Sequence, residues 1–238
     1  MIVLNSFVRR DVFLKKLQDL SVETWKFTSF AELSGVIRRH PEAKQCFLLL
    51  HGLNERGKRI YRKLCTHLPE DSLIIAPNAP FPLERWKEDR LDYGHSWYFY
   101  NKLEKTYFVN QDLAKYWLRD LLHELNPHKL PVTIIGFSQG GYLAPLVGEV
   151  IPETQMVIGL ACEFRRNLIL EFPKFKMVAV HGEEDAIIPL SMAQAEIEKF
   201  KNDGHIIDLY TVTETAHEIS SAMGEVVTGI IKNGKRSL

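Results

Sequence analysis

The chain of 238 residues is long enough to bury a substantial core, and its 45% hydrophobic and 25% charged residues are ordinary for a globular protein. Basic and acidic residues number 30 each, so the chain lacks the basic excess that a nucleic-acid partner normally requires. No apolar run approaches the length of a membrane span, and the three cysteines are widely spaced rather than arranged as a disulfide framework. These features predict a cytoplasmic protein.

Apolar, strand-like segments alternate with helix-length amphipathic segments, which is typical of a mostly parallel sheet covered by helices. Buried strands are predicted at 46–50, 73–76, 132–136, 156–161, 177–180 and 206–212. Helices are predicted at 11–20, 56–68, 110–125, 139–150, 191–203 and 217–231. Residues 24–39 are expected to add two antiparallel strands at the sheet edge. Together these elements predict a single α/β domain over residues 1–238.

The segment 80–108 interrupts this alternation, because it holds nine aromatic residues as well as prolines. It predicts a long irregular connection that follows the carboxyl end of a strand, where α/β sheets bind ligands. We expect it to form a pocket wall, with Trp86, Tyr93, Trp97 and Tyr98 as substrate-binding residues. The alternative is a small hydrophobic cluster that only packs the connection against the core.

A G-x-S-x-G pentad at 136–140 follows the apolar run 132–136 directly. This arrangement predicts a sharp turn from strand to helix that exposes the hydroxyl of Ser138. Gly136 and Gly140 flank the serine because a Cβ at either position would collide with the closely turned backbone.

A serine hydroxyl needs a base to remove its proton and an acid to orient that base. Ser138 follows the carboxyl end of a strand. Its partners must therefore also lie just after the carboxyl ends of strands, at the same edge of the parallel sheet. His217 follows the last predicted strand, whereas His205 precedes it and lies at the wrong edge. For the acid, Asp185 follows the strand 177–180, and Glu163 after the strand 156–161 is the alternative.

Acyl transfer also needs donors that face the developing oxyanion, and backbone amides suit this role because the fold fixes them. The Gln139 amide, at the start of the helix after Ser138, is one candidate. The Leu53 amide is the other, because Gly52 allows the loop after strand 46–50 to bend inward.

The order Ser138, Asp185, His217 resembles the α/β-hydrolase superfamily, specifically the carboxylesterase, acyl-protein thioesterase and phospholipase-like family. Six motifs of that family have counterparts in order from about residue 47 to the C-terminus. The counterparts are Leu50-His51-Gly52-Leu53, Pro77-Asn78-Ala79-Pro80, Gly94-His95-Ser96-Trp97, the stretch 136–141, the stretch 181–189 and Ala216-His217-Glu218-Ile219. The sequence departs from the family pattern at Asn54-Glu55, where Gly-Asp is usual, and at Ala216, where glycine is common.

The resemblance implies a serine hydrolase that cleaves a carboxylic ester or thioester through an acyl-enzyme, with no cofactor and no metal. The expected partner is a small-molecule ester or acyl substrate, and the sequence also allows a homodimer. Two alternatives stay open. One is a binding protein that keeps the fold without turnover, and the other is a lysophospholipase, lactone hydrolase or peptidase that uses the same three side chains.

Overall fold

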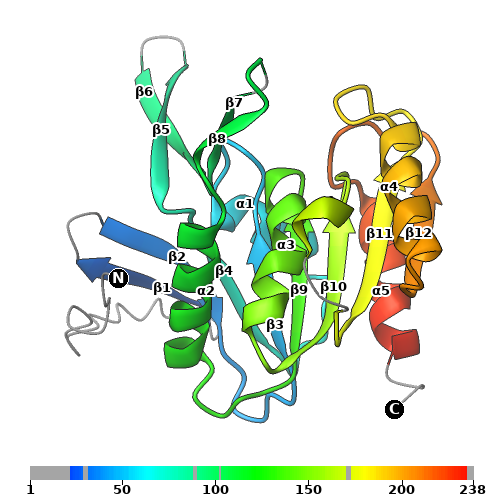
Figure 1. Cartoon of the computed structure of the whole chain (residues 1–238). Helices are drawn as coiled ribbons and strands as arrows, with labels where there is room; N and C mark the ends of the chain where they lie inside the picture. Colours follow the sequence, from blue (N-terminus) through cyan, green and yellow to red (C-terminus); the bar gives the residue numbers. More distant parts are fainter. Residues whose placement is uncertain (1–21, 29–31, 88–89, 102, 170–172, 235–238) are drawn as a thin grey trace.

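Figure 1 shows the computed structural model of the chain, which describes residues 22–28, 32–87, 90–101, 103–169 and 173–234. The helix expected at 11–20 lies outside the described residues. The strands are β1 (Val22–Thr28), β2 (Glu32–Arg38), β3 (Cys46–Leu50), β4 (Leu73–Pro77), β5 (Phe81–Lys87), β6 (Arg90–Ser96), β7 (Phe99–Asn101), β8 (Thr106–Val109), β9 (Val132–Phe137), β10 (Thr154–Leu160), β11 (Lys176–Gly182) and β12 (Ile207–Val212). The helices are α1 (Gly57–Leu64), α2 (Asp112–Leu125), α3 (Gln139–Val150), α4 (Leu190–Asn202) and α5 (Ser221–Gly234), with a short 3-10 turn, η1, at Arg166–Leu168.

The central sheet has eight strands in the order β1-β2-β4-β3-β9-β10-β11-β12. All neighbours from β4 to β12 pair in parallel, and β1 and β2 add an antiparallel edge. This confirms the predicted mostly parallel sheet, including the antiparallel pair at 24–39. The strands β3, β4 and β9 are buried along nearly their whole length, which explains why their sequences are continuous apolar runs.

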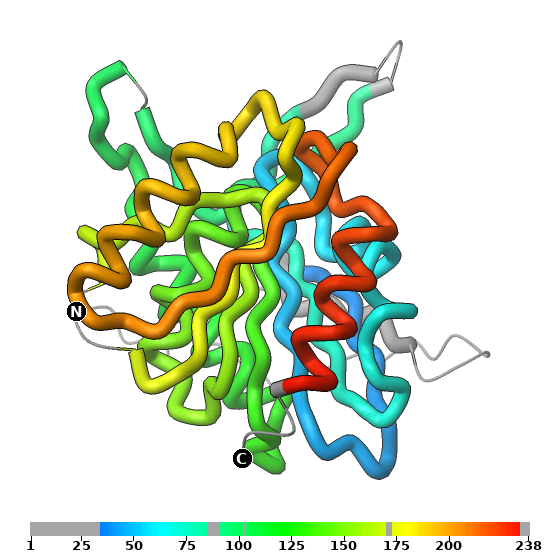
Figure 2. Tube along the Cα trace, turned by 90° about the vertical axis from the view of Figure 1, so that its right-hand side faces the viewer, coloured from blue at the N-terminus to red at the C-terminus, as the bar shows by residue number. Residues whose placement is uncertain are grey.

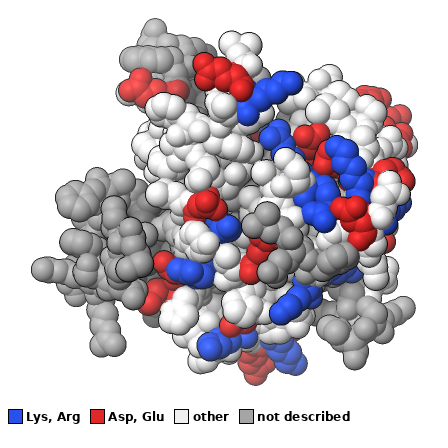
Figure 3. Space-filling view, in the orientation of Figure 1, with Lys and Arg blue, Asp and Glu red and all other residues white. Residues whose placement is uncertain are grey.

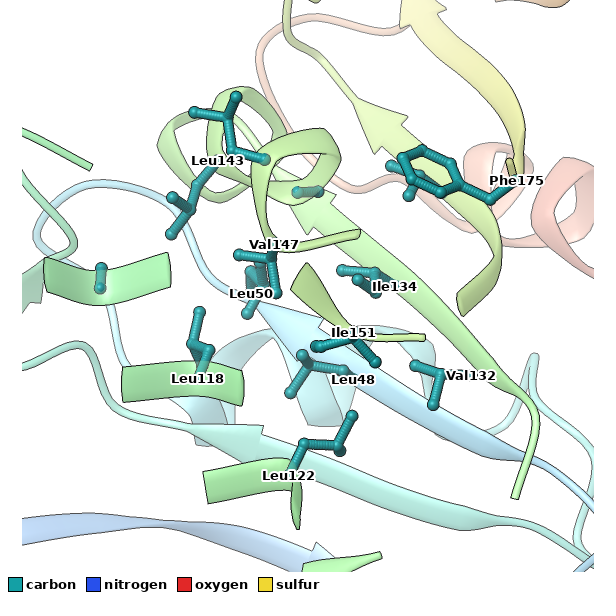
Figure 4. Close-up of a cluster of buried hydrophobic side chains, with 14 of the residues drawn as sticks. Leu48, Leu50, Leu118, Leu122, Val132, Ile134, Leu143, Val147, Ile151 and Phe175 are labelled. Carbon is teal, nitrogen blue, oxygen red and sulfur yellow. The ribbon is translucent and has the colours of Figure 1, made fainter. Parts of the chain in front are cut away.

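Helices cover both faces of the sheet and bury two hydrophobic layers. One layer joins the sheet to α2, α3 and α4, and the other joins it to α1 and α5. Figure 4 shows the first layer, in which Leu48 of β3 and Ile134 of β9 face Leu118 of α2 and Val147 of α3. Figure 2 shows α5, at the end of the chain, beside α1 on the opposite face. Burying each such side chain stabilises the fold by about 1.5–3 kcal/mol.

The segment 80–108 differs from the expectation of an irregular connection. It forms two antiparallel hairpins, β5–β6 and β7–β8, which are separate from the central sheet. Figure 1 shows both hairpins rising from the end of the molecule where β10 and β11 finish. Side chains along β8 alternate between half-buried and exposed, and aromatic residues suit such short, half-buried strands.

The parallel strands place the ends of β3, β9, β11 and β12 at one edge of the sheet, and the paired residues are in register there. The predicted helix at 217–231 begins only at Ser221, which leaves His217 in the loop after β12.

Figure 3 shows acidic and basic side chains interspersed on one face, in keeping with their equal numbers in the sequence. Among the described residues, no helix has both the length and the apolar character needed to span a bilayer.

Candidate active site

The turn between β9 and α3 is tightly packed around Ser138. Ser138 has φ 49° and ψ −116°, a conformation that is strained for a residue with a Cβ. A Cβ on Gly136 would lie 2.2 Å from the carbonyl oxygen of Gly140, and one on Gly140 would lie 2.2 Å from that of Leu50. The two glycines are therefore required by the close approach of the backbone at this turn.

Ser138, His217 and Asp185 form a continuous chain of hydrogen bonds at the carboxyl edge. Ser138 Oγ lies 2.9 Å from His217 Nε2, and His217 Nδ1 lies 2.8 Å from Asp185 Oδ2. The other carboxylate oxygen of Asp185 accepts the amides of Ile187 at 2.9 Å and Ile188 at 2.8 Å. Because these bonds fix the carboxylate, His217 can donate from Nδ1 and keep Nε2 free to accept the proton of Ser138.

Glu163, the alternative acid, does not take part in this chain. Its carboxylate lies 3.4 Å from Arg165 Nε, and no hydrogen bond joins it to His217 within the described residues. The geometry therefore favours Asp185 as the partner of His217.

The loop after β3, which carries Leu53, begins beside the start of α3, since a Cβ on Gly140 would lie 2.7 Å from the His51 carbonyl oxygen. Gly52 itself does not have positive φ; Asn54 does, with φ 58°. Asparagine tolerates this left-handed conformation better than most residues, which explains how the chain can form the turn without the glycine usual at this position in the family. Gly52 is needed for space instead, because a Cβ there would lie 2.9 Å from the Phe137 ring.

His51 holds this loop from inside the protein. It is fully buried, donates from Nδ1 to the Gly52 carbonyl at 2.7 Å, and accepts the Ala79 amide at Nε2 at 3.0 Å. Burial lowers the pKa of His51 to about 3, so the ring is neutral and these two bonds define its tautomer. The indole of Trp97 donates to the His51 carbonyl at 2.8 Å.

The side chain of Gln139 joins the turn around Ser138, the candidate nucleophile, to the segment between the two hairpins. This turn, residues 136–140, is named the nucleophile turn. The sequence did not predict this role of Gln139. Its Oε1 accepts the Trp97 amide at 3.0 Å, and its Nε2 donates to the Tyr98 carbonyl and to Ser96 Oγ, both at 2.9 Å. Its backbone amide is also a predicted oxyanion donor, so the prediction and these side-chain bonds assign two different roles to one residue. The one sequence feature that could have indicated the role of the side chain is that a polar residue directly follows Ser138.

Hairpin β5–β6 is attached to the loop after β3 through its backbone. Asn54 donates to the His95 carbonyl at 2.8 Å, and His95 donates to the Glu55 carbonyl at 2.9 Å. Arg56 adds a bond to the Tyr93 carbonyl at 2.8 Å and an ion pair with Asp92 at 2.6 Å. His95 is itself buried, which lowers its pKa, and donates from Nδ1 to the Ala79 carbonyl.

The predicted substrate-binding residues lie at different places in the two hairpins and between them. Trp97 is 0% exposed and Tyr98 is 8% exposed, so these two side chains support the loops from within and do not form an open wall. Tyr93 is 52% exposed on β6, where the Arg56 guanidinium lies 4.2 Å from its ring centroid. Trp86 lies on β5 opposite Leu91. Trp97 and Tyr98 lie between the two hairpins, where bonds to His51 and Gln139 hold them, and a count of aromatic residues in the sequence does not report these contacts.

A cavity of ≈ 530 Å³ lies at the opposite edge of the sheet, where α2 and α3 end, and Leu122, Asn126 and Ile151 are among its lining residues. It is therefore separate from the Ser138 site. The described residues include no group of three or more histidine, cysteine, aspartate or glutamate side chains placed to hold a metal ion.

The chain matches the model of one protein family, described as Phospholipase/Carboxylesterase, over residues 31–233. The match begins upstream of residue 47, where the recognisable motifs start, and includes β2. No curated protein matches the chain significantly.

Solved structures with a similar fold include esterase PE8, with a TM-score of 0.65 and 20% identity over 84% of this chain and 98% of that one. TT1662 from Thermus thermophilus has a TM-score of 0.66 and 20% identity, covering 91% of this chain and 99% of that one. Acyl-protein thioesterase 2 from Zea mays has a TM-score of 0.63 and 18% identity, covering 83% and 97%. At these identities the likeness establishes the fold alone.

Proposed function

Because this chain belongs to the phospholipase/carboxylesterase family, we propose that it is a serine hydrolase that cleaves a carboxylic ester or thioester through an acyl-enzyme. The observation that carries this proposal is the hydrogen-bonded chain from Ser138 through His217 to Asp185. A nucleophile, a base and an orienting acid in this geometry are the minimum required for acyl transfer by a serine.

In the proposed reaction, Ser138 Oγ attacks the substrate carbonyl carbon while His217 Nε2 takes the hydroxyl proton. Asp185 holds the other ring nitrogen and stabilises the imidazolium that forms. The proton on Nε2 then passes to the leaving alcohol or thiol, and the acyl group stays on Ser138. Water repeats the same two steps, which releases the acid and restores the serine.

The amides of Leu53 and Gln139 are proposed to bind the oxyanion of both tetrahedral intermediates. Gln139 begins α3, where the first amides have no partner within the helix. The Leu53 amide makes no hydrogen bond within the described part of the chain, so it is available to a ligand. Losing one such donor typically costs 10²–10³ in kcat.

Labelling with a fluorophosphonate tests the nucleophile directly. The wild-type protein should gain one phosphonyl group on Ser138, found by mass spectrometry of the labelled peptide. The variant Ser138→Ala should neither label nor hydrolyse p-nitrophenyl butyrate. An unlabelled wild-type protein that is shown to be folded would contradict the proposal, and would favour the alternative of a binding protein without turnover.

The identity of the acid is tested with a matched pair of variants. Asp185→Asn keeps the shape of the side chain but removes its charge, and should lower kcat for p-nitrophenyl butyrate by roughly 10⁴. Glu163→Gln makes the same chemical change a few residues after β10 and should leave kcat for this uncharged ester within about threefold, since no hydrogen bond in the described part of the chain joins Glu163 to His217. A larger loss in Glu163→Gln than in Asp185→Asn would reverse the assignment.

The choice among ester, thioester, lactone and peptide substrates depends on the groups around the triad. Matched substrates that share one acyl group and differ in the leaving group should give the largest kcat/KM for an ester or thioester. A higher value for the amide or lactone would place the protein among the peptidases or lactone hydrolases that use the same chemistry.

A further inference from the structure

Arg165 lies at the same sheet edge as the candidate triad, on the chain segment that leaves β10. Leu160, the last residue of β10, accepts the Ser138 amide at its carbonyl at 2.9 Å. Two residues later Cys162 packs against α3, since a Cβ built on Gly141 would lie 2.4 Å from its Sγ. The segment that carries Arg165 therefore passes directly beside the nucleophile turn.

Aromatic side chains from two elements hold the Arg165 guanidinium in place. Its central carbon lies 5.0 Å from the ring centroid of Tyr142, on α3, and 5.1 Å from that of Tyr100, on β7. Tyr142 is one helical turn after Ser138, and its amide donates to the Ser138 carbonyl. Such contacts orient a guanidinium without using its N–H groups, because the attraction is to the faces of the rings.

The N–H groups of Arg165 are only partly used by the protein. Nη1 donates to Tyr107 Oη at 3.3 Å, and Nε lies 3.4 Å from Glu163 Oε1. A guanidinium has five donors, and Nη2 has no hydrogen-bond partner within the described residues. The side chain is 30% exposed, so it is not sealed within the protein.

The next residue provides a comparison. Arg166 donates to Asp203 Oδ2 and to the Ile169 carbonyl, both at 2.7 Å, and is therefore held by short bonds within the protein. Arg165 and Arg166 carry the same charge, but only Arg165 combines long, incomplete bonding with a position beside α3 and hairpin β7–β8.

We propose that Arg165 is a specificity-determining residue that binds a carboxylate group carried by the substrate of the proposed hydrolase. The inference rests on the proposed function, which it extends to the chemical class of the substrate. A carboxylate fits the planar donors of a guanidinium with two parallel hydrogen bonds. Glu163 places a negative charge 3.4 Å from Arg165 Nε and repels any second anion, so it disfavours a dianion such as phosphate more strongly than a single carboxylate.

Two pairs of esters test this inference, each pairing a carboxylate with a neutral group of similar size. Mono-p-nitrophenyl adipate against p-nitrophenyl hexanoate places the carboxylate on the acyl side. The butyrate ester of 4-hydroxybenzoate against that of 4-hydroxybenzamide places it on the alcohol side. The readout is the ratio of kcat/KM for the charged and the neutral ester, with hydrolysis in Ser138→Ala subtracted.

We expect the wild-type ratio in at least one pair to exceed that of Arg165→Gln by roughly 10- to 100-fold, the value of a charge-assisted hydrogen bond. Arg165→Lys should keep part of the preference, and Glu163→Gln should increase it by removing the competing carboxylate. Arg166→Gln, which removes the same charge one residue away, should leave the ratio unchanged.

Equal ratios in wild type and Arg165→Gln for both pairs would overturn the inference. If Arg165 only supported hairpin β7–β8, Arg165→Gln would lower kcat/KM for the charged and neutral esters by the same factor, which also overturns it. The proposed function fails separately, when wild type and Ser138→Ala hydrolyse the neutral esters at the same rate.

Discussion

In the proposed mechanism the nucleophile turn and the loop after β3 act on the same reacting centre, but the two regions are held in different ways. The turn around Ser138 is fixed by residues within two positions of it and by the end of β3, because Gly136 and Gly140 allow backbone atoms to approach closely. The loop that carries Leu53 is fixed by distant residues: His51 bonds to Ala79, Trp97 bonds to His51, and His95 pairs with Asn54 and Glu55.

The geometry of the two regions therefore depends on different contacts. The nucleophile turn cannot move without disturbing closely packed backbone, so the packing of β3, β9 and α3 fixes its geometry. The loop after β3 depends on side-chain and backbone bonds to hairpin β5–β6 and to the segment that follows it. We therefore expect glycine substitutions in the nucleophile turn to lower stability the most, and substitutions that loosen the Leu53 loop to have smaller effects on stability, its pH dependence or kcat.

The largest effect is expected from Gly140→Ala. Its Cβ would lie 2.2 Å from the Leu50 carbonyl oxygen, so the backbone of β3 or α3 must shift. We expect the free energy of unfolding to fall by more than about 3 kcal/mol. Gly229→Ala in α5 is the matched control, because nothing lies within 4 Å of its new Cβ, and it should stabilise the protein by about 0.5–1 kcal/mol in urea denaturation. Similar stability of the two variants would contradict the role of close packing at the turn.

The second effect concerns pH and the buried His51. Burial lowers its folded-state pKa to about 3, whereas the unfolded chain binds a proton near pH 6.5. Below pH 6.5 the unfolded state therefore takes up a proton that the folded state does not, and stability falls as the pH decreases. His51 alone should contribute about 1.4 kcal/mol per pH unit between pH 6 and 4, and the lowered pKa of His95 acts in the same direction.

Urea denaturation at several pH values checks this prediction. His51→Asn should be less stable at pH 7, because its hydrogen bonds to Gly52 and Ala79 are lost, but its stability should depend less on pH. His123→Asn, at an exposed histidine on α2, is the control and should follow the wild-type pH dependence. The prediction is wrong if His51→Asn and wild type lose stability in parallel from pH 7 to pH 5.

The third effect tests the connection between the two regions through Gln139. Gln139→Met keeps the volume of the side chain but removes its bonds to Ser96, Trp97 and Tyr98. We expect kcat for p-nitrophenyl butyrate to fall roughly 10- to 30-fold with KM within a factor of about three, as for lost transition-state stabilisation.

Gln111→Met is the matched control for this substitution. Gln111 is also buried, but it bonds to Tyr107 of hairpin β7–β8 rather than to the Ser96–Tyr98 segment. It should lower stability by a similar amount and leave kcat within about threefold. If both variants lost kcat equally, the effect of Gln139 would be one of general stability.

The smallest effect is expected at Arg56, which ties hairpin β5–β6 to the start of α1. Its ion pair with Asp92 is partly exposed, and such pairs contribute at most about 1 kcal/mol. Arg56→Ala should reduce kcat for p-nitrophenyl butyrate by less than about fivefold, and Lys58→Ala on the exposed side of α1 should have no effect. A loss of more than about 30-fold in Arg56→Ala would mean that the hairpin controls the Leu53 loop more strongly than its backbone bonds imply.

The sequence predicted the central sheet and the sheet edge that carries the site. Strands β3, β4 and β9 are continuous apolar segments because both of their faces are buried. In a parallel sheet the residues that follow the carboxyl ends meet at one edge, so Ser138 and His217, with Asp185 or Glu163 as the acid, could be grouped from their positions after strands.

Tertiary structure alone decided how the loops at that edge are held. Contacts between segments distant in sequence bury Trp97 in the core and accompany the left-handed conformation of Asn54. Such contacts also bring Gln139 and Arg165 against the hairpins and the segment between them. Local patterns report burial averaged over an element, so they identify strands and helices well. They do not specify which side chains of two separate segments share a hydrogen bond, because that is settled only when the segments pack together.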